Sequence, residues 1–133
     1  MLLEVKHLKK VFNTRFSKEE TIALRDIDFS VEEGEYIAIM GESGSGKTTL
    51  LNILSTLDRP TCGRVLLNKK DITSIKDKEL SVFRREHLGF VFQDFNLIDT
   101  LSIRDNIYLP LVLSKANLTL MQLRLNQLAP KLN

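Results

Sequence analysis

Residues 41–48 read GESGSGKT, and they directly follow the apolar run YIAIM at 36–40. The eight residues match the pattern G-x-x-x-x-G-K-[ST] of phosphate-binding loops. Glycines permit backbone conformations that other residues avoid, so consecutive N–H groups can face one bound anion. The Ile-rich apolar run predicts a strand that is covered on both faces. A strand, a loop and a helix in succession indicate an α/β fold.

Each fixed position of this pattern has a chemical reason. Lys47 would bring a positive charge to the β- and γ-phosphates, and the Thr48 hydroxyl would bind Mg²⁺. The helix that follows would direct the positive end of its dipole at the same phosphates. The alternative is a Gly/Ser-rich turn that only caps a helix. We favour a site for a nucleoside triphosphate with Mg²⁺, and its candidate residues are Gly41, Glu42, Ser43, Gly44, Ser45, Gly46, Lys47, Thr48 and Thr49.

The sequence on either side of the loop predicts further elements. Alternating residues in LLEVKHL and IDFSV predict two strands, the first with Leu3, Val5 and His7 on one side. Leucines at helical spacing predict a helix over 47–57, and the run RVLL predicts another strand.

The C-terminal half reads as mostly helical. Residues 77–87 form a polar helical pattern, and LGFVF at 88–92 predicts a short apolar strand. The spacing of Ser102 and Asp105 predicts a helix N-cap. Apolar residues at every third or fourth position from Leu118 predict a further helix, which a proline would end early.

Composition narrows the class of protein. The chain has 133 residues, of which 43% are hydrophobic and 27% charged, as in ordinary globular domains. Its net charge of +2 gives no electrostatic reason to expect nucleic acid as a partner. Cys62 is the single cysteine, which excludes an internal disulfide and suits a reducing compartment. We expect a cytoplasmic chain with one domain.

Two stretches resemble the ATP-binding subunits of ABC transporters. They are ALRDIDFSVEEGEYIAIMGESGSGKTTLLNIL at 23–54 and LGFVFQDFNLIDTLSIRDNIYLPL at 88–111. The resemblance is greatest to the branch that exports or releases lipoproteins, macrolides and antimicrobial peptides. Within that branch, LSTLDRPT at 54–61 and FNLIDTLSIRDNIYLPLVLS at 95–114 resemble the bacitracin-resistance type.

This resemblance implies a P-loop NTPase fold of the ABC type. It implies N-terminal antiparallel strands, a Walker A strand-loop-helix and the start of a helical subdomain, in an N-terminal portion that ends before the signature and Walker B. The nucleotide-binding core would take about 1–93, from Walker A to the Q-loop, and the start of the helical subdomain about 94–133.

The resemblance also assigns site residues. Gln93 is similar to the Q-loop glutamine, which implies contact with Mg²⁺ and the hydrolytic water, and hence a catalytic role beside Lys47. Phe12 stands where the family places an aromatic residue that stacks on adenine. The alternatives are that Phe16 takes this role or that Phe12 is a core residue.

Several features of such subunits are not found in the 133 residues. No glycine follows Gly89, so no Leu-Ser-Gly-Gly-Gln signature follows Gln93. No glutamate follows Glu86 and no histidine follows His87, so a catalytic glutamate and a switch histidine are also missing. We therefore expect this chain alone to bind ATP without turning it over, because trans-acting charge is worth about 10³–10⁵ in rate in comparable enzymes.

The resemblance implies partners and a location for the complete protein. It would pair with a second ATP-binding subunit as a homodimer and with a membrane-spanning permease subunit. It would lie on the inner face of the plasma membrane and couple ATP hydrolysis to export or detoxification of peptide-like or lipid-linked compounds.

The sequence is also compatible with two other functions. FVFQD could be a Walker B strand ending in Asp94, as in a small P-loop kinase or GTPase. The chain could also be a truncated, non-catalytic regulator that pairs with a longer subunit.

Overall fold

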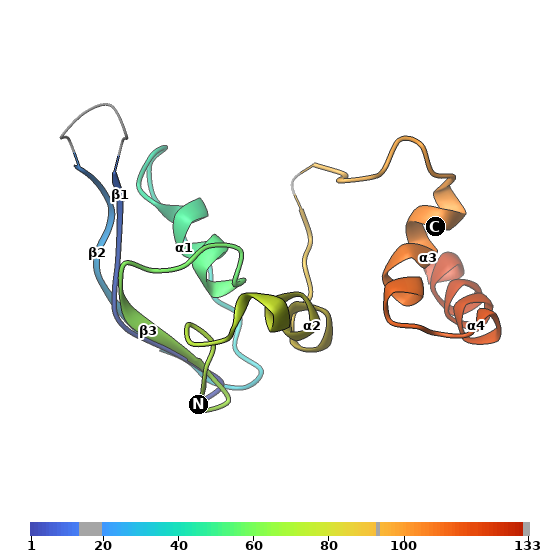
Figure 1. The fold of residues 1–133 in the computed structure, drawn as a ribbon, viewed down its shortest axis with the longest axis horizontal. Coiled ribbons are helices and arrows are strands. Elements are labelled where there is room, and N and C mark those ends of the chain that lie inside the picture. Colours follow the sequence, from blue (N-terminus) through green and yellow to red (C-terminus); the bar gives the residue numbers. More distant parts are fainter. Residues whose placement is uncertain (14–19, 93, 132–133) are drawn as a thin grey trace. The chain divides into compact units, whose positions relative to one another are not determined.

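The computed structural model describes residues 1–13, 20–92 and 94–131. The chain divides into two compact units, Met1–Arg84 and Arg85–Asn133. Figure 1 shows the strands and the first helix in one unit and the last two helices in the other. Among the described residues, no helix has the length and apolar character needed to cross a membrane.

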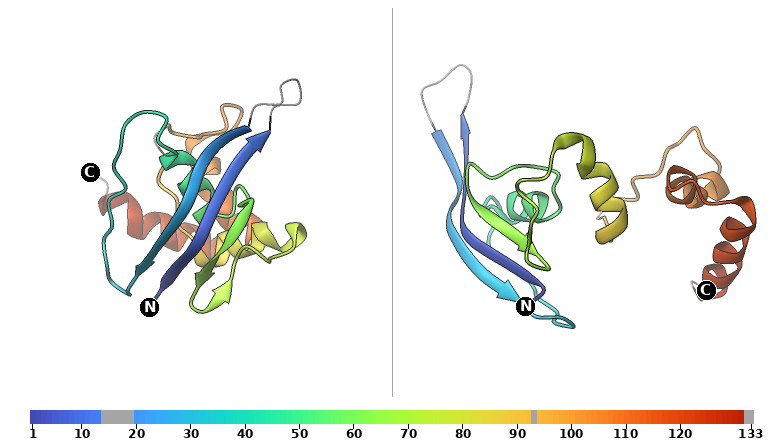
Figure 2. Two further views of the ribbon diagram at one scale, coloured as in Figure 1. Left: turned by 90° about the vertical axis from the view of Figure 1, so that its left-hand side faces the viewer. Right: turned by 60° about the horizontal axis from the view of Figure 1, so that its bottom comes forward.

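A four-stranded antiparallel sheet forms the first unit, with the strand order β2-β1-β3-β4. β1 (Leu3–Asn13) is the long inner strand between β2 (Glu20–Val31) and β3 (Cys62–Leu67). The short β4 (Lys70–Asp71) lies at the edge beside β3. Figure 2 shows β1 and β2 running side by side as one twisted ribbon. The predicted N-terminal antiparallel strands are therefore confirmed.

A β-bulge at His7 changes which side chains of β1 face the core. His7 has a φ of 49°, and the pairing of β1 with β2 shifts between Val5 and Leu8. Val5 and Leu8 are buried, whereas His7 is exposed. The prediction that His7 shares the side of Leu3 and Val5 is wrong, because an extra residue in a strand reverses the faces that follow it.

α1 (Lys47–Leu54) lies on one face of the sheet (Figure 1). The predicted helix over 47–57 ends three residues early, because Thr56 adopts a left-handed φ of 59°. The N–H of Leu57 then donates to the carbonyl of Asn52 at 2.8 Å, which closes the helix in the manner of a Schellman motif. Leu57 is 54% exposed rather than part of the buried stripe.

The buried side chains of the first unit come from the sheet, from α1 and from the segment around α2 (Asp77–His87). Among the described residues of this unit, the buried apolar ones are Val5, Leu8, Leu24, Leu50, Ile53, Val65, Ile72, Ile75 and Phe83.

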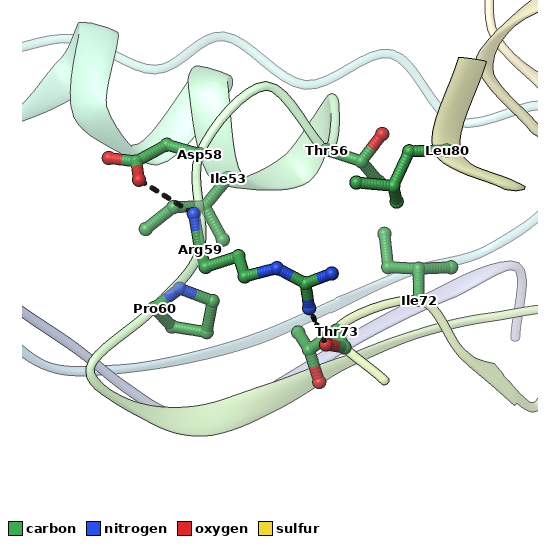
Figure 3. Close-up of a pocket in the computed structure, with 8 residues that line it drawn as sticks. All are labelled: Ile53, Thr56, Asp58, Arg59, Pro60, Ile72, Thr73 and Leu80. Atoms are coloured by element: carbon green, nitrogen blue, oxygen red, sulfur yellow. Dashed lines mark hydrogen bonds between the residues drawn. The ribbon is translucent and has the colours of Figure 1, made fainter. Parts of the chain in front are cut away.

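The turn after α1 is tied to the segment that precedes α2. The guanidinium of Arg59 donates to the carbonyl oxygens of Thr73 at 2.8 Å and Ile75 at 2.6 Å, and to a carboxylate oxygen of Asp77 at 2.7 Å. Figure 3 shows the Arg59 side chain extended toward Thr73, with Asp58 bonded to its backbone N–H. These contacts hold the turn in one position.

The apolar runs at 36–40 and 88–92 do not form the predicted strands. Tyr36 and Met40 are 95% and 88% exposed, and Val91 is fully exposed. A strand needs a neighbour for its N–H and C=O groups, and the described residues place no strand beside either run. The prediction of a strand covered on both faces is therefore wrong for 36–40 in this structure.

The second unit contains α3 (Ile103–Leu113), α4 (Leu118–Leu128) and the 3₁₀ turn η1 (Ala129–Lys131). The Ser102 hydroxyl accepts the N–H of Asp105 at 3.1 Å, which confirms the predicted N-cap. Asn117 caps α4 in the same way by accepting the N–H of Leu120 at 2.8 Å. The predicted helix from Leu118 is confirmed, and α4 ends at Leu128, shortly before Pro130. Of its apolar stripe Met121 is buried, whereas Leu118 and Leu128 are exposed.

Candidate functional site: the loop before α1

The first residue of α1 follows directly on Gly46. Gly46 has a φ of 92°, and a Cβ atom at this position would lie 2.5 Å from the carbonyl oxygen of Ala23 in β2. A side chain here would therefore be strained and would also collide with the backbone of the sheet. The fixed glycine of the motif is thus the residue that lets the loop pack against β2.

The side chain of Lys47 folds back into the loop. Its Nζ donates to the carbonyl oxygens of Gly41 at 2.8 Å and Glu42 at 2.5 Å, and to the Ser45 hydroxyl at 3.3 Å. These acceptors hold the ammonium group inside the curve of the loop. Five residues of the loop are exposed, so a ligand can reach them: Gly41, Glu42, Ser43, Gly44 and Ser45.

The backbone at the start of α1 offers donors to an anion. The N–H groups of Lys47, Thr48 and Thr49 precede the first helical bond, which runs from the Leu50 N–H to the Gly46 carbonyl at 2.8 Å. No side chain among the described residues caps this end. Free amides and the helix dipole together favour negative charge at such a position.

The donor set fits a nucleoside triphosphate with Mg²⁺. Backbone amides and one ammonium suit phosphate oxygens, and the exposed Thr48 hydroxyl suits the metal ion. When bound, Mg²⁺ would neutralise part of the charge on the phosphates. All nine candidate residues, 41 to 49, lie in this loop or in the first turn of α1.

Phe12 lies near the end of β1 and is 44% exposed. This exposure argues against a core position, and the ring is reachable from solvent. The Nζ of Lys10 lies 4.8 Å from the centroid of the ring. Stacking of Phe12 on adenine stays a prediction. Phe16 and Gln93 lie outside the described residues, so the roles expected of them also stay predictions.

A contact that no sequence pattern indicated joins β1 to the turn after α1. Lys10 Nζ donates to Asp58 Oδ1 and to the Arg59 carbonyl oxygen, both at 2.7 Å. The pairing of β1 with β3, in which Lys9 lies opposite Cys62, brings these distant segments together. A lysine in a strand and an aspartate after a helix carry no local signal of such a contact.

A second polar cluster surrounds the bulge of β1. The His7 N–H donates to Asp28 Oδ1 at 2.9 Å, and His7 Nδ1 lies 3.2 Å from Asp26 Oδ1. All three residues are exposed. These contacts satisfy the bulged backbone, and we assign the cluster a structural role.

Comparison with known proteins agrees with the motif. The family model described as ABC transporter matches residues 24–133. The ABC transporter ATP-binding protein YxdL of Bacillus subtilis (strain 168) is 53% identical over 131 residues, which cover 98% of this chain and 50% of that protein. The bacitracin export ATP-binding protein BceA of Halalkalibacterium halodurans is 47% identical over 114 residues, with 86% and 44% coverage.

A solved structure shows the same fold. It is the dimeric, post-hydrolysis state of the ATP-binding cassette MJ0796 of Methanocaldococcus jannaschii, bound to ADP and Pi. It matches with a TM-score of 0.77 and 40% identity over 84% of this chain and 47% of that chain. The chain spans about half the length of the relatives it matches.

These similarities favour an ABC cassette over the kinase or GTPase reading of Asp94. The loop holds the Lys47 side chain, as its motif predicts. Residues 24–133 match the ABC transporter family model. The chain belongs to the ABC transporter family, among its ATP-binding subunits.

Proposed function

We propose that the chain binds Mg-ATP through residues 41–49, as part of an ABC transporter that exports or detoxifies peptide-like or lipid-linked compounds. The observation that carries the proposal is the loop itself, in which the Lys47 ammonium is held by the Gly41 and Glu42 carbonyls at the start of α1. That arrangement keeps one positive charge within the loop that leads into α1, whose first N–H groups have no helical acceptor.

Individual residues would have distinct roles. Lys47 would stabilise charge on the β- and γ-phosphates, and Thr48 would bind Mg²⁺. Gln93 would contact the metal ion and position the attacking water, and Phe12 would stack on adenine.

Turnover would require more than these 133 residues supply. The sequence has no Leu-Ser-Gly-Gly-Gln signature after position 93 and no glutamate after Glu86. Without groups that stabilise the transferred phosphoryl and polarise water, bound ATP would persist. We therefore propose that this chain binds ATP and that hydrolysis takes place only when those groups are present.

The transport role rests on the relatives. One relative is named for bacitracin export, and one solved relative is a dimeric cassette, which supports a second ATP-binding subunit as a partner. A permease partner is expected because the matched family is one of transporters. Residues 95–98 are a candidate contact with the permease, because Phe95 and Leu97 are 93% and 58% exposed. Such a complex would place the chain on the inner face of the plasma membrane.

Titration calorimetry with Mg-ATP tests the proposal. Binding heat in the wild type that is lost in Lys47→Ala supports it, and no heat from folded wild-type protein refutes it. A parallel phosphate-release assay separates binding from turnover. Sustained release that disappears in Lys47→Ala would show that the chain hydrolyses ATP and would overturn the second part of the proposal.

A further inference from the structure

Lys10 is an unusually constrained lysine on β1. Its side chain is only 13% exposed, and its Nζ donates to Asp58 Oδ1 and to the Arg59 carbonyl, each at 2.7 Å. Two short bonds to a partly buried ammonium leave the side chain little freedom.

The acceptors that hold Lys10 are themselves fixed. Asp58 Oδ1 also accepts the Arg59 N–H at 2.7 Å, and the Asp58 N–H donates to the Asn52 carbonyl of α1 at 3.1 Å. The guanidinium of Arg59 is bonded to the Thr73 carbonyl, as Figure 3 shows. The ammonium of Lys10 is therefore held in place by the turn that ends α1.

This ammonium faces an aromatic ring. Lys10 Nζ lies 4.8 Å from the centroid of Phe12, within the range of a cation–π interaction, and the low exposure of Lys10 strengthens the attraction. A cation held at one face of the ring restricts its rotamers. The other face is then the one left for a planar ligand, since Phe12 is 44% exposed.

We propose that Lys10 is a positioning residue that orients Phe12 for stacking on adenine. The inference rests on the proposed function, because it needs ATP at the loop and its base at Phe12. Through Asp58 the ring is oriented relative to the C-terminal end of α1, the helix whose first turn would hold the phosphates. In this proposal, the base site is linked to the phosphate site through α1 and its closing turn.

The test compares two ligands that differ by the nucleoside. Dissociation constants for Mg-ATP and for Mg-tripolyphosphate are measured by calorimetry at one ionic strength. In Lys10→Met, affinity for Mg-ATP should fall about fivefold relative to tripolyphosphate, as loss of a partly desolvated cation–π contact predicts. Lys10→Arg should keep the wild-type ratio of the two affinities, because arginine retains the positive charge and can pair with Asp58.

Lys9→Met is the matched control. It removes the same charge from the neighbouring position on β1, where the half-buried Lys9 side chain makes no hydrogen bond or ion pair with the described residues. It should leave the ratio unchanged. Phe12→Ala should lower the ratio by roughly tenfold, and adding Lys10→Met to it should lower it no further.

Asp58→Asn is a second variant in case Lys10→Met does not fold. It keeps an oxygen that can accept the Arg59 N–H, and it weakens the hydrogen bond with Lys10 by removing the negative charge. It should lower the ratio in the same direction by a smaller factor. An unchanged ratio in both variants, or an equal loss for both ligands, overturns the role of Lys10. A wild type that binds neither ligand overturns the proposed function, and the positioning role falls with it.

Discussion

A Cβ atom built on Gly63 of β3 collides with the carbonyl oxygen of His7 in the bulge of β1. Gly63 also has a left-handed φ of 85°. The pairing of β1 with β3 is interrupted at this point, between Lys6 and Lys9. Only a residue without a side chain lets β3 approach the bulged backbone so closely, so the central strand pair of the sheet depends on this glycine.

Gly63→Ala should therefore lower the free energy of unfolding by about 3 kcal/mol, since backbone strain and a steric clash act together. Urea denaturation followed by circular dichroism measures the change. Gly89→Ala is the control, because a Cβ atom there meets nothing within 4 Å, and it should change stability by no more than about 0.5 kcal/mol. Equal stability of the two variants would contradict the structure at the bulge.

Leu8→Ala tests the reversal of faces that the bulge causes. Leu8 is fully buried, so its truncation should cost about 2–5 kcal/mol from lost burial and the cavity left behind. Leu57→Ala, which removes the same atoms from a 54% exposed leucine, should cost far less. Urea denaturation followed by circular dichroism measures both losses of stability. Similar losses in the two variants would argue against the core described above.

Gly46→Ala should weaken Mg-ATP binding by roughly tenfold or more, a loss of at least about 1.4 kcal/mol. The reason is that the new Cβ would lie 2.5 Å from the Ala23 carbonyl and displace the start of α1. Gly44 has a similar φ of 80°, but a Cβ atom built there meets no atom within 4 Å. Gly44→Ala therefore measures the cost of the backbone conformation without a steric clash. Calorimetry should show a smaller loss there, and the reverse order would be evidence against the packing of the loop on β2.

Ser102→Ala should destabilise α3 by about 1 kcal/mol, because the Asp105 N–H loses its acceptor. Amide hydrogen exchange in the first turn of α3 reports this loss directly. Ser102→Thr keeps the hydroxyl and should preserve most of the protection. If alanine and threonine gave the same exchange rates, the hydroxyl would not be the cap.

The elements predicted best are those whose signals are local. The bounds of α2, Asp77–His87, agree with the predicted polar helix, and the Ser102 cap lies where its spacing placed it. The match to a phosphate-binding loop depended on eight consecutive residues. In each case the groups that interact are within a few residues of one another, so pattern alone is informative.

The predictions that failed required knowledge of neighbours. The bulge at His7 depends on how β1 meets β2 and β3, and alternation of residue types does not reveal it. The early end of α1 depends on the left-handed turn at Thr56. The run at 36–40 has the composition of a buried strand, yet no strand lies beside it among the described residues, so it forms no strand and is mostly exposed.

The sequence by itself determined that this chain has a loop of the phosphate-binding pattern before a helix, and that it resembles ABC transporter ATP-binding subunits. Residues that are consecutive in the chain are neighbours in space in any fold, so a motif built from them can be recognised from the sequence alone. Only the tertiary structure decided that Leu8 rather than His7 enters the core, and that Asp58 holds the Lys10 ammonium against Phe12. The contact of Lys10 with Asp58 joins residues far apart in the chain, and long-range strand pairing and packing select it and the burial of Leu8.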